Sequence, residues 1–590
     1  MHNGPAWLPA RCALGRERRQ ASSSAPRTNI IHDIMPSKFR DAGSGSLLAP
    51  LAAALILAAS CATIAAPRSS SAVTMRDLPA TRPERTNFIE TSHYADVVAF
   101  LDSLKRLNAP LAFGSIGRTS EGREIPYVIA SRPLVHSAAE AHASGRLIVY
   151  VQGNIHAGEV EGKEAMQSLL RDLTFAPHAN VLDSIVLVAV PIYNADGNER
   201  FLPQDRQRGA QNGPEMVGQR PNTQGPNGQG FDLNRDYIKA EAPETRASLA
   251  MFNEWNPDIF VDLHTTDGSF HGYALTYSPS LHPSAPLGDY SRTLLAELRQ
   301  RVRARDGFEI YDYGNFNDGG GREISTDSTH NGWYTYDHHP RFGTNYYGLR
   351  GRISFLGEAF SHDPFERRIK ATYSFVTQLL SLVAEKKLEI RGMEQHADAQ
   401  LAGVIPVPVA LAADLPKTAP LAPVAFEVLA RTGDSSRTQP GVPKGLRRTG
   451  RFKTQVMPVF DRFVPTLVRR MPAAYYLSDT TAVALLRLHG VLVDRIAAAA
   501  APAPMERFVI DSVVKSARPF QGHNETHPWG HWEPAPAGTS LEYLVRTRQP
   551  LGRVAMYLLD PESDDGLAMW NVFDAALARG TYPVLRAKAP

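Results

Sequence analysis

The chain has 590 residues, of which 43% are hydrophobic and 21% charged, and its formal net charge is +3. This length exceeds what one compact core usually holds, so we expect two or more folded units. So small a net charge gives no electrostatic reason to expect nucleic acid or a membrane surface as a partner. The two cysteines, Cys12 and Cys61, precede the first segment that reads as folded, so a metal in the folded part would need His and carboxylate ligands.

Residues 47–66 form an uninterrupted run of small and apolar residues behind Lys38 and Arg40. This pattern is typical of a secretory signal. A run of this length would also suffice for one membrane span, but its many alanines make it a weak anchor and favour export. We therefore expect a periplasmic, extracellular or outer-surface protein, with no membrane contact beyond an N-terminal signal or lipid anchor.

Met35 reads as the true start of the chain, because the residues before it are a leader that no signal peptide requires. Cys61 follows Ala-Ala-Ser, which places it near a lipoprotein box and makes it a candidate for lipid attachment. The expected divisions are residues 1–34 before the true start, 35–66 as signal peptide or lipoprotein signal, 67–84 as linker, 85–390 as catalytic domain, and 391–590 as accessory region.

Residues 85–390 alternate between strand and helix patterns. Two continuous apolar runs, 146–154 and 184–194, flank a segment with helical spacing at 161–173, which predicts a βαβ unit. The predicted elements that follow are a helix at 244–255, a strand at 258–266, a helix at 290–306, a strand at 352–360 and a closing helix at 364–387. This order predicts an α/β domain with a largely parallel sheet, whose ligands bind at the carboxyl ends of the strands.

The pattern changes after residue 390. Residues 400–460 are short strands punctuated by proline, and 472–500 has the pattern of a small strand–helix–strand unit. Residues 505–590 suggest further short strands and turns. We expect an accessory region of mixed or mostly β structure.

His156 and Glu159 follow the first of these strands, three residues apart. With 19 histidines, about one such pair is expected by chance, so the pair alone could be a polar turn before a helix. His264, at the end of another strand, supplies a third ligand. Two imidazoles and one carboxylate form a catalytic zinc site with a fourth position open to water. Asp232 and Asp262 are both candidates to orient the histidines.

Hydrolysis also requires a general base and cationic groups. Glu358 is the acidic residue of the strand at 352–360 and is a candidate base, although it could instead pair with Arg350 or Arg352. Arg220 and Arg235, in the loop at 218–237, are candidates to hold a substrate carboxylate and to stabilise an oxyanion.

Apart from Arg220, these candidates fall in five motifs whose order is specific, although no single motif is. The motifs are HAGE at 156–159, NADGNERF at 194–201, FDLNRDY at 231–237, DLHTT at 262–266 and the late strand glutamate, Glu358. Together they resemble the zinc carboxypeptidases of the carboxypeptidase A-like fold, over roughly residues 90–385. The resemblance implies a twisted mixed, largely parallel sheet flanked by helices.

The resemblance also implies the roles of individual residues. By this resemblance His156, Glu159 and His264 bind one zinc ion, and Asp232 supports His156. Glu358 is the general base and proton shuttle. Asn234 and Arg235 bind the substrate's C-terminal carboxylate, and Arg220 polarises the scissile carbonyl. The family also places a tyrosine over the substrate. Tyr336, Tyr346 and Tyr347 are available, and spacing favours Tyr336.

The leading hypothesis is therefore a zinc metallocarboxypeptidase acting on peptides or proteins with a free C-terminal carboxylate. One alternative keeps the metal chemistry but acts on cell-wall peptides or N-acyl amino acids. Another is a non-catalytic surface protein built on a peptidase scaffold. The His-rich segments 338–340 and 522–532 have spacings that favour surface or aromatic-packing roles over metal binding.

Overall fold

The structure is a computed structural model. It describes residues 78–588 except 177, 179, 201–230, 267–268, 317–329, 404, 434–441, 443–444, 497–503 and 540. These residues fall within one compact unit, Val73–Pro590. The predictions for the signal segment, Cys61 and Arg220 lie outside the described residues.

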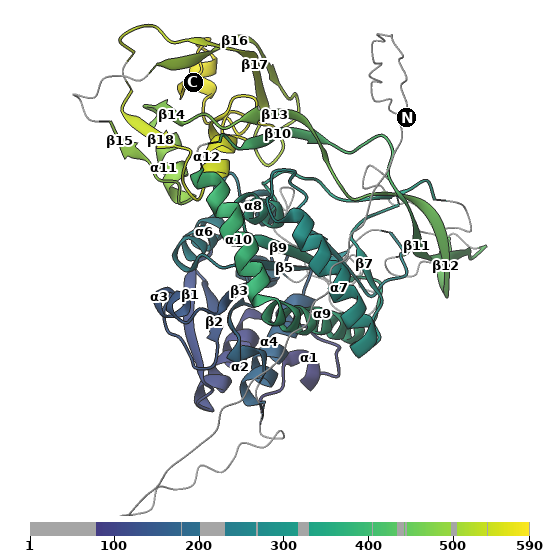
Figure 1. Cartoon of the computed structure of the whole chain (residues 1–590). Coiled ribbons are helices and arrows are strands. Elements are labelled where there is room, and N and C mark those ends of the chain that lie inside the picture. Colours follow the sequence, from purple (N-terminus) through teal and green to yellow (C-terminus); the bar gives the residue numbers. More distant parts are fainter. Residues whose placement is uncertain are drawn as a thin grey trace, which may run out of the picture. The chain divides into compact units, whose positions relative to one another are not determined.

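An eight-stranded mixed sheet forms the centre of the first half of the described chain (Figure 1). In spatial order its strands are β1 (Leu111–Arg118), β2 (Glu124–Ala130), β4 (Ile185–Val190), β3 (Leu147–Gly153), β5 (Ile259–Thr266), β9 (Ile353–Phe360), β6 (Leu275–Pro279) and β7 (Ile310–Asp312). Strands β4, β3, β5 and β9 run parallel, as do β6 and β7. The β1–β2, β2–β4 and β6–β9 pairs are antiparallel. The predicted fold class is confirmed.

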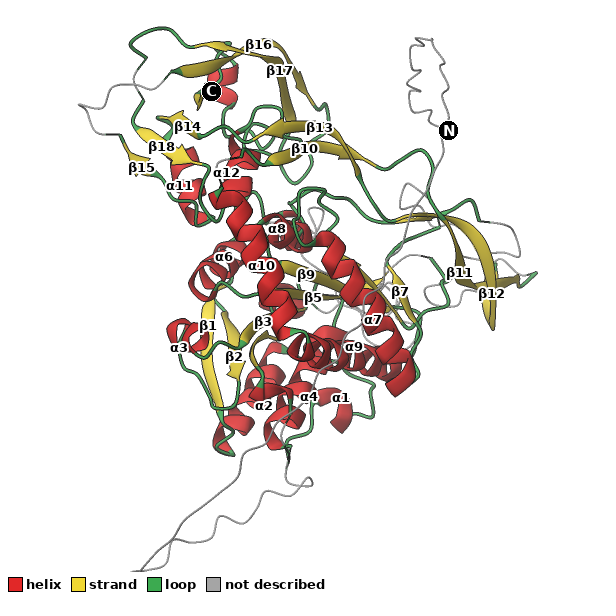
Figure 2. Cartoon of the chain, viewed as in Figure 1, coloured by secondary structure: helices red, strands yellow, loops and turns green. Residues whose placement is uncertain are grey.

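Helices cover both faces of this sheet (Figure 2). Residues alternate along β3, so that Val149 packs in one hydrophobic cluster and Tyr150 in the other, both fully buried. The Val149 side carries α2 (Tyr94–Arg106), α4 (Glu161–Phe175), α7 (Gly288–Asp306), α9 (Phe365–Glu385) and α10 (Lys387–Ala402). The Tyr150 side carries α3 (Ala138–Ala143), α6 (Pro243–Trp255) and α8 (Gly343–Leu349). The short helices α1 (Arg82–Arg85) and α5 (Ala195–Asn198) complete this half.

The predicted elements of this half agree with the observed ones to within a few residues, with one correction. The closing helix expected at 364–387 is two helices, because the backbone leaves helical geometry at Lys386, where φ is −89° and ψ is 10°. The helix α10 then continues to Ala402, beyond the region for which a helix was predicted.

The second half contains additional β sheets, as predicted. One pairs β10 (Pro408–Asp414) with β13 (Val464–Arg470), and a second joins β11 (Leu421–Arg431), β12 (Leu446–Phe460) and β8 (Trp333–Tyr334). A third contains, in order, β15 (Asp494–Arg495), β18 (Tyr543–Arg546), β14 (Ala474–Leu477), β19 (Val584–Ala587), β16 (Met505–Lys515) and β17 (Thr526–Pro534). The helices of the second half after α10 are α11 (Thr480–Leu488), α12 (Gly552–Leu559) and α13 (Asp574–Leu577).

Two sequence predictions for this half can be compared with these elements. The unit expected at 472–500 is present as β14, α11 and β15, although β18 separates the two strands in the sheet. The segment 505–590 was expected to hold strands and turns, but it also holds α12. All eight residues of α12 are buried, and a helix this short spans too few turns for sequence periodicity to identify it. The boundary at residue 390 stays a prediction.

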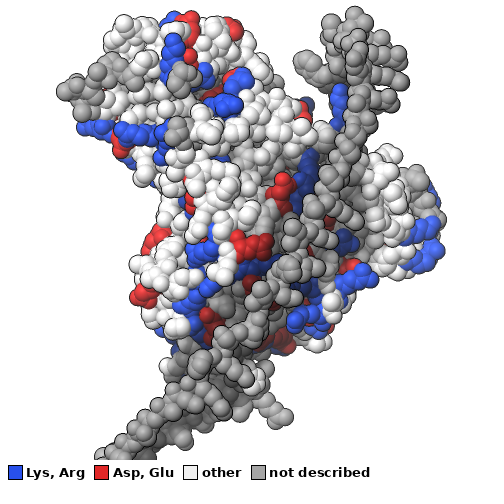
Figure 3. All heavy atoms as spheres, viewed as in Figure 1, with Lys and Arg blue, Asp and Glu red and all other residues white. Residues whose placement is uncertain are grey.

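On the face shown in Figure 3, acidic and basic side chains are interspersed, which agrees with the small net charge of +3. Among the described residues, no helix combines the length and the apolar character needed to cross a membrane.

Candidate active site

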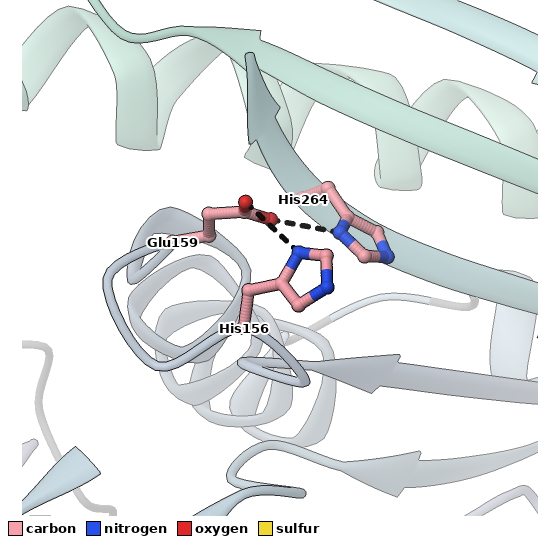
Figure 4. A group of neighbouring side chains, drawn as sticks. All are labelled: His156, Glu159 and His264. Carbon is pink, nitrogen blue, oxygen red and sulfur yellow. Dashed lines mark hydrogen bonds and ion pairs between the residues drawn. The ribbon is translucent and has the colours of Figure 1, made fainter. Parts of the chain in front are cut away.

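His156, Glu159 and His264 converge at the carboxyl ends of neighbouring strands (Figure 4). His156 lies in the turn between β3 and α4, and His264 lies near the end of β5, which pairs with β3 in parallel. The Glu159 carboxylate is 3.0 Å from His156 Nδ1 and 2.7 Å from His264 Nδ1. One ligand atom from each residue lies within 4.8 Å of the others. The predicted ligands therefore share one small volume.

The outer nitrogen of each histidine faces a second carboxylate. His156 Nε2 is 3.0 Å from Asp232 Oδ1, and His264 Nε2 is 3.1 Å from Asp262 Oδ2. Asp262 also accepts a hydrogen bond from Gln152. Both Asp232 and Asp262 were candidates from the sequence, and each faces one of the two histidines. Such partners fix the ring orientation and leave both Nδ1 atoms facing Glu159.

The electrostatics of this cluster favour a bound cation. Burial acts to lower the pKa of His156, but the charges of Glu159 and Asp232 outweigh it and raise the pKa to about 10. Burial likewise acts to raise the pKa of Glu159, but the two histidines hold it well below its usual range. Two imidazoles and a carboxylate are the donor set of catalytic zinc sites, and in a metal complex the ion takes the place of the protons. The residues present fit zinc.

Glu358 lies on β9 directly beside this cluster. In the parallel pairing of β5 with β9, Glu358 is the partner of His264. Glu358 is 9% exposed and lines the same cavity as His156 and Glu159. Sheet register alone therefore places a carboxylate next to the histidine ligand.

A cavity of about 390 Å³ opens beside these residues. The described residues that line it are His156, Glu159, Asp232, Asn234, Arg235, Thr265, Thr266, Tyr313, Tyr336, Phe342, Thr344, Leu356, Glu358, Phe520 and Gln521. The lining thus combines the metal-ligand cluster, a candidate base, an arginine and several aromatic rings.

Asn234 and Arg235 reach the cavity from the short helix η4 (Leu233–Arg235). Asn234 Oδ1 accepts a hydrogen bond of 3.0 Å from the Gly343 amide, which fastens η4 to the start of α8. The Arg235 guanidinium lies over the Phe342 ring at 3.8 Å and donates to the Asn234 carbonyl at 2.8 Å. Stacking on an aromatic face holds the guanidinium in place while its remaining donors stay available.

Of the three tyrosines considered from the sequence, only Tyr336 is in the cavity wall. Tyr346 and Tyr347 lie on α8 and are fully buried in the hydrophobic cluster that this helix joins. Burial raises the pKa of Tyr336, so its hydroxyl stays protonated. Its role toward a substrate stays a prediction.

Phe520 and Gln521 were not expected in the site. Both line the cavity, and Gln521 Oε1 accepts a hydrogen bond of 3.1 Å from the Asp232 amide, 289 residues away in sequence. Neither residue lies in a recognisable motif, and only tertiary packing brings them to the strand ends.

The sequence profile of the zinc carboxypeptidase family matches residues 97–350. These residues belong to that family. The match covers β3, β5 and the ligand cluster but ends just before β9, so Glu358 lies outside it. The match supports a zinc carboxypeptidase hydrolase, and it agrees with the residues found to fit zinc.

Related proteins carry the same description. Carboxypeptidase 2 of Trichophyton rubrum is 24% identical over 526 residues, covering 83% of this chain and 85% of the relative. That coverage is more than residues 85–390 alone can supply, so the similarity includes part of the second half. Probable carboxypeptidase 2 of Arthroderma benhamiae is 29% identical over 171 residues, covering 28% of this chain and 27% of the relative.

Solved structures show weaker similarity. A metallo-carboxypeptidase from Burkholderia cenocepacia matches with a TM-score of 0.35 and 18% identity, covering 50% of this chain and 70% of that one. A metallo-carboxypeptidase from Pseudomonas aeruginosa, solved with (2-guanidinoethylmercapto)succinic acid, matches with a TM-score of 0.36 and 17% identity, covering 51% and 71%.

Proposed function

We propose that this chain is an exported zinc metallocarboxypeptidase that hydrolyses the C-terminal peptide bond of peptides or proteins. The observation that carries the proposal is the convergence of His156, Glu159 and His264 at the wall of a cavity that Glu358 and Arg235 also line. Metal ligands, a base and a carboxylate-binding cation in one cavity are the requirements of carboxypeptidase chemistry.

His156, Glu159 and His264 would hold one zinc ion at this site. When bound, such an ion supplies Lewis acidity and lowers the pKa of a coordinated water to about 7. Asp232 and Asp262 position the two imidazoles, because Asp232 contacts His156 Nε2 at 3.0 Å and the Asp262 carboxylate lies as a charged partner 3.1 Å from His264 Nε2.

Glu358 is the proposed general base and proton shuttle. Its carboxylate takes a proton from the attacking water and then gives that proton to the amine that leaves when the peptide bond breaks. The support is its place opposite His264 in the sheet and its exposure to the cavity.

The substrate's terminal carboxylate is the proposed partner of Arg235, with Asn234 beside it. A guanidinium binds a carboxylate through two parallel hydrogen bonds, and the Phe342 ring beneath Arg235 supports that orientation. Tyr336 is proposed to cover the substrate. Arg220, for which the family resemblance is the support, is proposed to polarise the scissile carbonyl.

Export is proposed from the apolar run at 47–66, with Cys61 as a candidate for lipidation. The substrate alternatives are cell-wall peptides and N-acyl amino acids, since Arg235 selects a free carboxylate but not the acyl group attached to it. A non-catalytic binding protein would have no physical need for a histidine–carboxylate cluster at strand ends.

The test compares pairs of peptides that differ only in a free or amidated C-terminus. We expect the zinc-loaded chain to release the last residue of the free acids, to leave the amides intact, and to lose this activity with a chelator. Equal hydrolysis of both members of each pair would contradict an exopeptidase. Stoichiometric zinc without hydrolysis of any peptide in a library would favour the binding protein.

A further inference from the structure

A second cluster of histidines and carboxylates lies in the segment between β8 and α8. Asp337, His338 and His339 each offer a ligand atom, and these atoms lie within 4.8 Å of one another. Asp337 Oδ1 is 3.4 Å from His338 Nδ1, and the same carboxylate oxygen contacts His339 Nδ1. The two rings lie 4.3 Å apart at an angle of 30°.

The carboxylates and imidazoles of this cluster are arranged like those of the catalytic cluster. At the catalytic cluster Glu159 faces two Nδ1 atoms, while two other carboxylates face the Nε2 atoms. In the second cluster Asp337 faces both Nδ1 atoms, and Asp564 Oδ2 lies 3.1 Å from His338 Nε2 and 3.6 Å from His339 Nε2. A carboxylate behind each imidazole is the arrangement that fixes the tautomer of metal-ligating histidines.

The cluster also leaves a buried nitrogen without a hydrogen bond. His338 is 4% exposed, and no described residue hydrogen-bonds to its Nδ1 atom, which faces the Asp337 carboxylate at 3.4 Å. A buried polar atom without a partner is costly unless a ligand occupies the space beside it. The ring does pack on Phe463 at 4.6 Å, as expected for an aromatic-packing role, but packing leaves the nitrogen unsatisfied.

The surrounding hydrogen bonds hold this segment in its conformation before any ion binds. The Asn345 amide donates to the carbonyls of Asp337 at 2.9 Å and His339 at 3.2 Å. Asp564 is fixed in turn, because its Oδ1 atom accepts from Tyr557 and its amide donates to the Leu411 carbonyl.

We propose that Asp337, His338 and His339 bind a second zinc ion, with Asp564 orienting both imidazoles. Two imidazoles and one carboxylate suit zinc. The ion would hold the segment that carries Tyr336 and Phe342, both in the cavity wall, in one conformation, and His338 Nε2 would link that segment to Asp564 in the second half of the chain. The full chain would then hold two zinc ions, rather than the one that the family resemblance implies.

The test is the zinc content of the full chain after zinc loading and dialysis. We expect two zinc ions per wild-type chain and one in each of the single variants His339→Ala and His264→Ala. The variant that carries both substitutions should hold none. His531→Ala, which removes an imidazole that is 58% exposed, should keep two. One ion in wild type and none in His264→Ala would overturn the proposal and leave an ion-pair network only.

Crystals of the zinc-loaded wild-type chain provide a second measurement that needs no variant to fold. Anomalous scattering at the zinc edge should give one peak between His156 and His264 and another bounded by Asp337, His338 and His339. A second peak anywhere else, or no second peak, would contradict the proposal. A peak at the second cluster alone would instead remove support for the proposed function.

Discussion

The two halves of the molecule contribute to the cavity in different ways. In the first half, strand pairing puts His264 beside Glu358, and the turn after β3 brings His156 to the same edge. Among the described residues of the second half, no strand pairing brings a residue to the site. Phe520 and Gln521 reach the cavity through tertiary contacts instead. The comparison shows that the chemistry is encoded locally at strand ends, whereas part of the wall depends on how the whole chain folds.

The largest effect is expected in the first half. His264→Ala removes one of the three proposed metal ligands, so zinc should be lost from the proposed catalytic site and kcat/KM should fall by at least about 10³-fold. Metal analysis and peptide hydrolysis measure both quantities. The matched control, His396→Ala, changes an exposed histidine on α10 and should alter neither. Full activity in His264→Ala would show that the strand-end cluster is not the catalytic centre.

A large effect on stability is expected in the second half, at Asp560. Burial raises the pKa of its carboxyl from 3.8 to about 6. Because the folded pKa is above the unfolded one, the stability this group contributes is complete below about pH 4 and is lost as the pH rises through about 6. Asp560→Asn should therefore raise the free energy of unfolding at pH 8 by up to about 3 kcal/mol and change it little at pH 4.

Chemical unfolding at both pH values measures this difference. One hydrophobic cluster contains Tyr150 and Phe260 from the central sheet together with Tyr475 and Tyr557 from the second half. We therefore expect one cooperative transition that shifts as a whole in Asp560→Asn. Two separate transitions, only one of them shifted, would show that the two halves fold independently.

Arg235 tests whether the first half recognises a free carboxylate. Losing a charge-assisted contact costs about 1.5–3 kcal/mol, so Arg235→Ala should lower kcat/KM on free-acid peptides by roughly tenfold to a hundredfold. KM should rise on these peptides, while any slow hydrolysis of amidated ones should be unaffected. Arg235→Lys keeps the charge but not the bidentate geometry, so its kcat/KM should lie between those of the wild type and Arg235→Ala. Equal losses on both peptide classes would refute the role.

A smaller effect is expected from the second half. Phe520→Ala and Gln521→Ala should each raise KM several-fold, because one enlarges the cavity and the other loses a hydrogen bond worth about 1 kcal/mol. Zinc content should not change. Trp529→Ala, an aromatic that is 58% exposed on β17, is the control and should leave KM unchanged. Unchanged kinetics in all three variants would mean that the second half is only a scaffold.

Much of the first half could be predicted from sequence because its signals are local. Continuous apolar runs identified β3 and β4, since a strand buried on both faces needs apolar residues throughout. His156, Glu159 and His264 follow from the rule that ligands gather at the carboxyl ends of parallel strands.

The remainder could not be predicted because its signals are distant in sequence. Asp564 lies 226 residues from His338, and Gln521 lies 289 residues from Asp232, so no spacing rule connects either pair. The helix α12 has only eight residues, too few turns for periodicity to identify it, which is why it was missed. The resemblance assigned Asp232 to His156, but the pairing of Asp262 with His264 required coordinates.

The central claim is that Glu358 acts as the base beside the metal held by His156, Glu159 and His264. The most direct measurement is the hydrolysis of a free-acid peptide by Glu358→Gln at saturating substrate, with zinc content determined on the same sample. The account predicts unchanged zinc and a kcat lower by about 10²–10⁴-fold. A kcat close to that of the wild type, with the zinc retained, would contradict it.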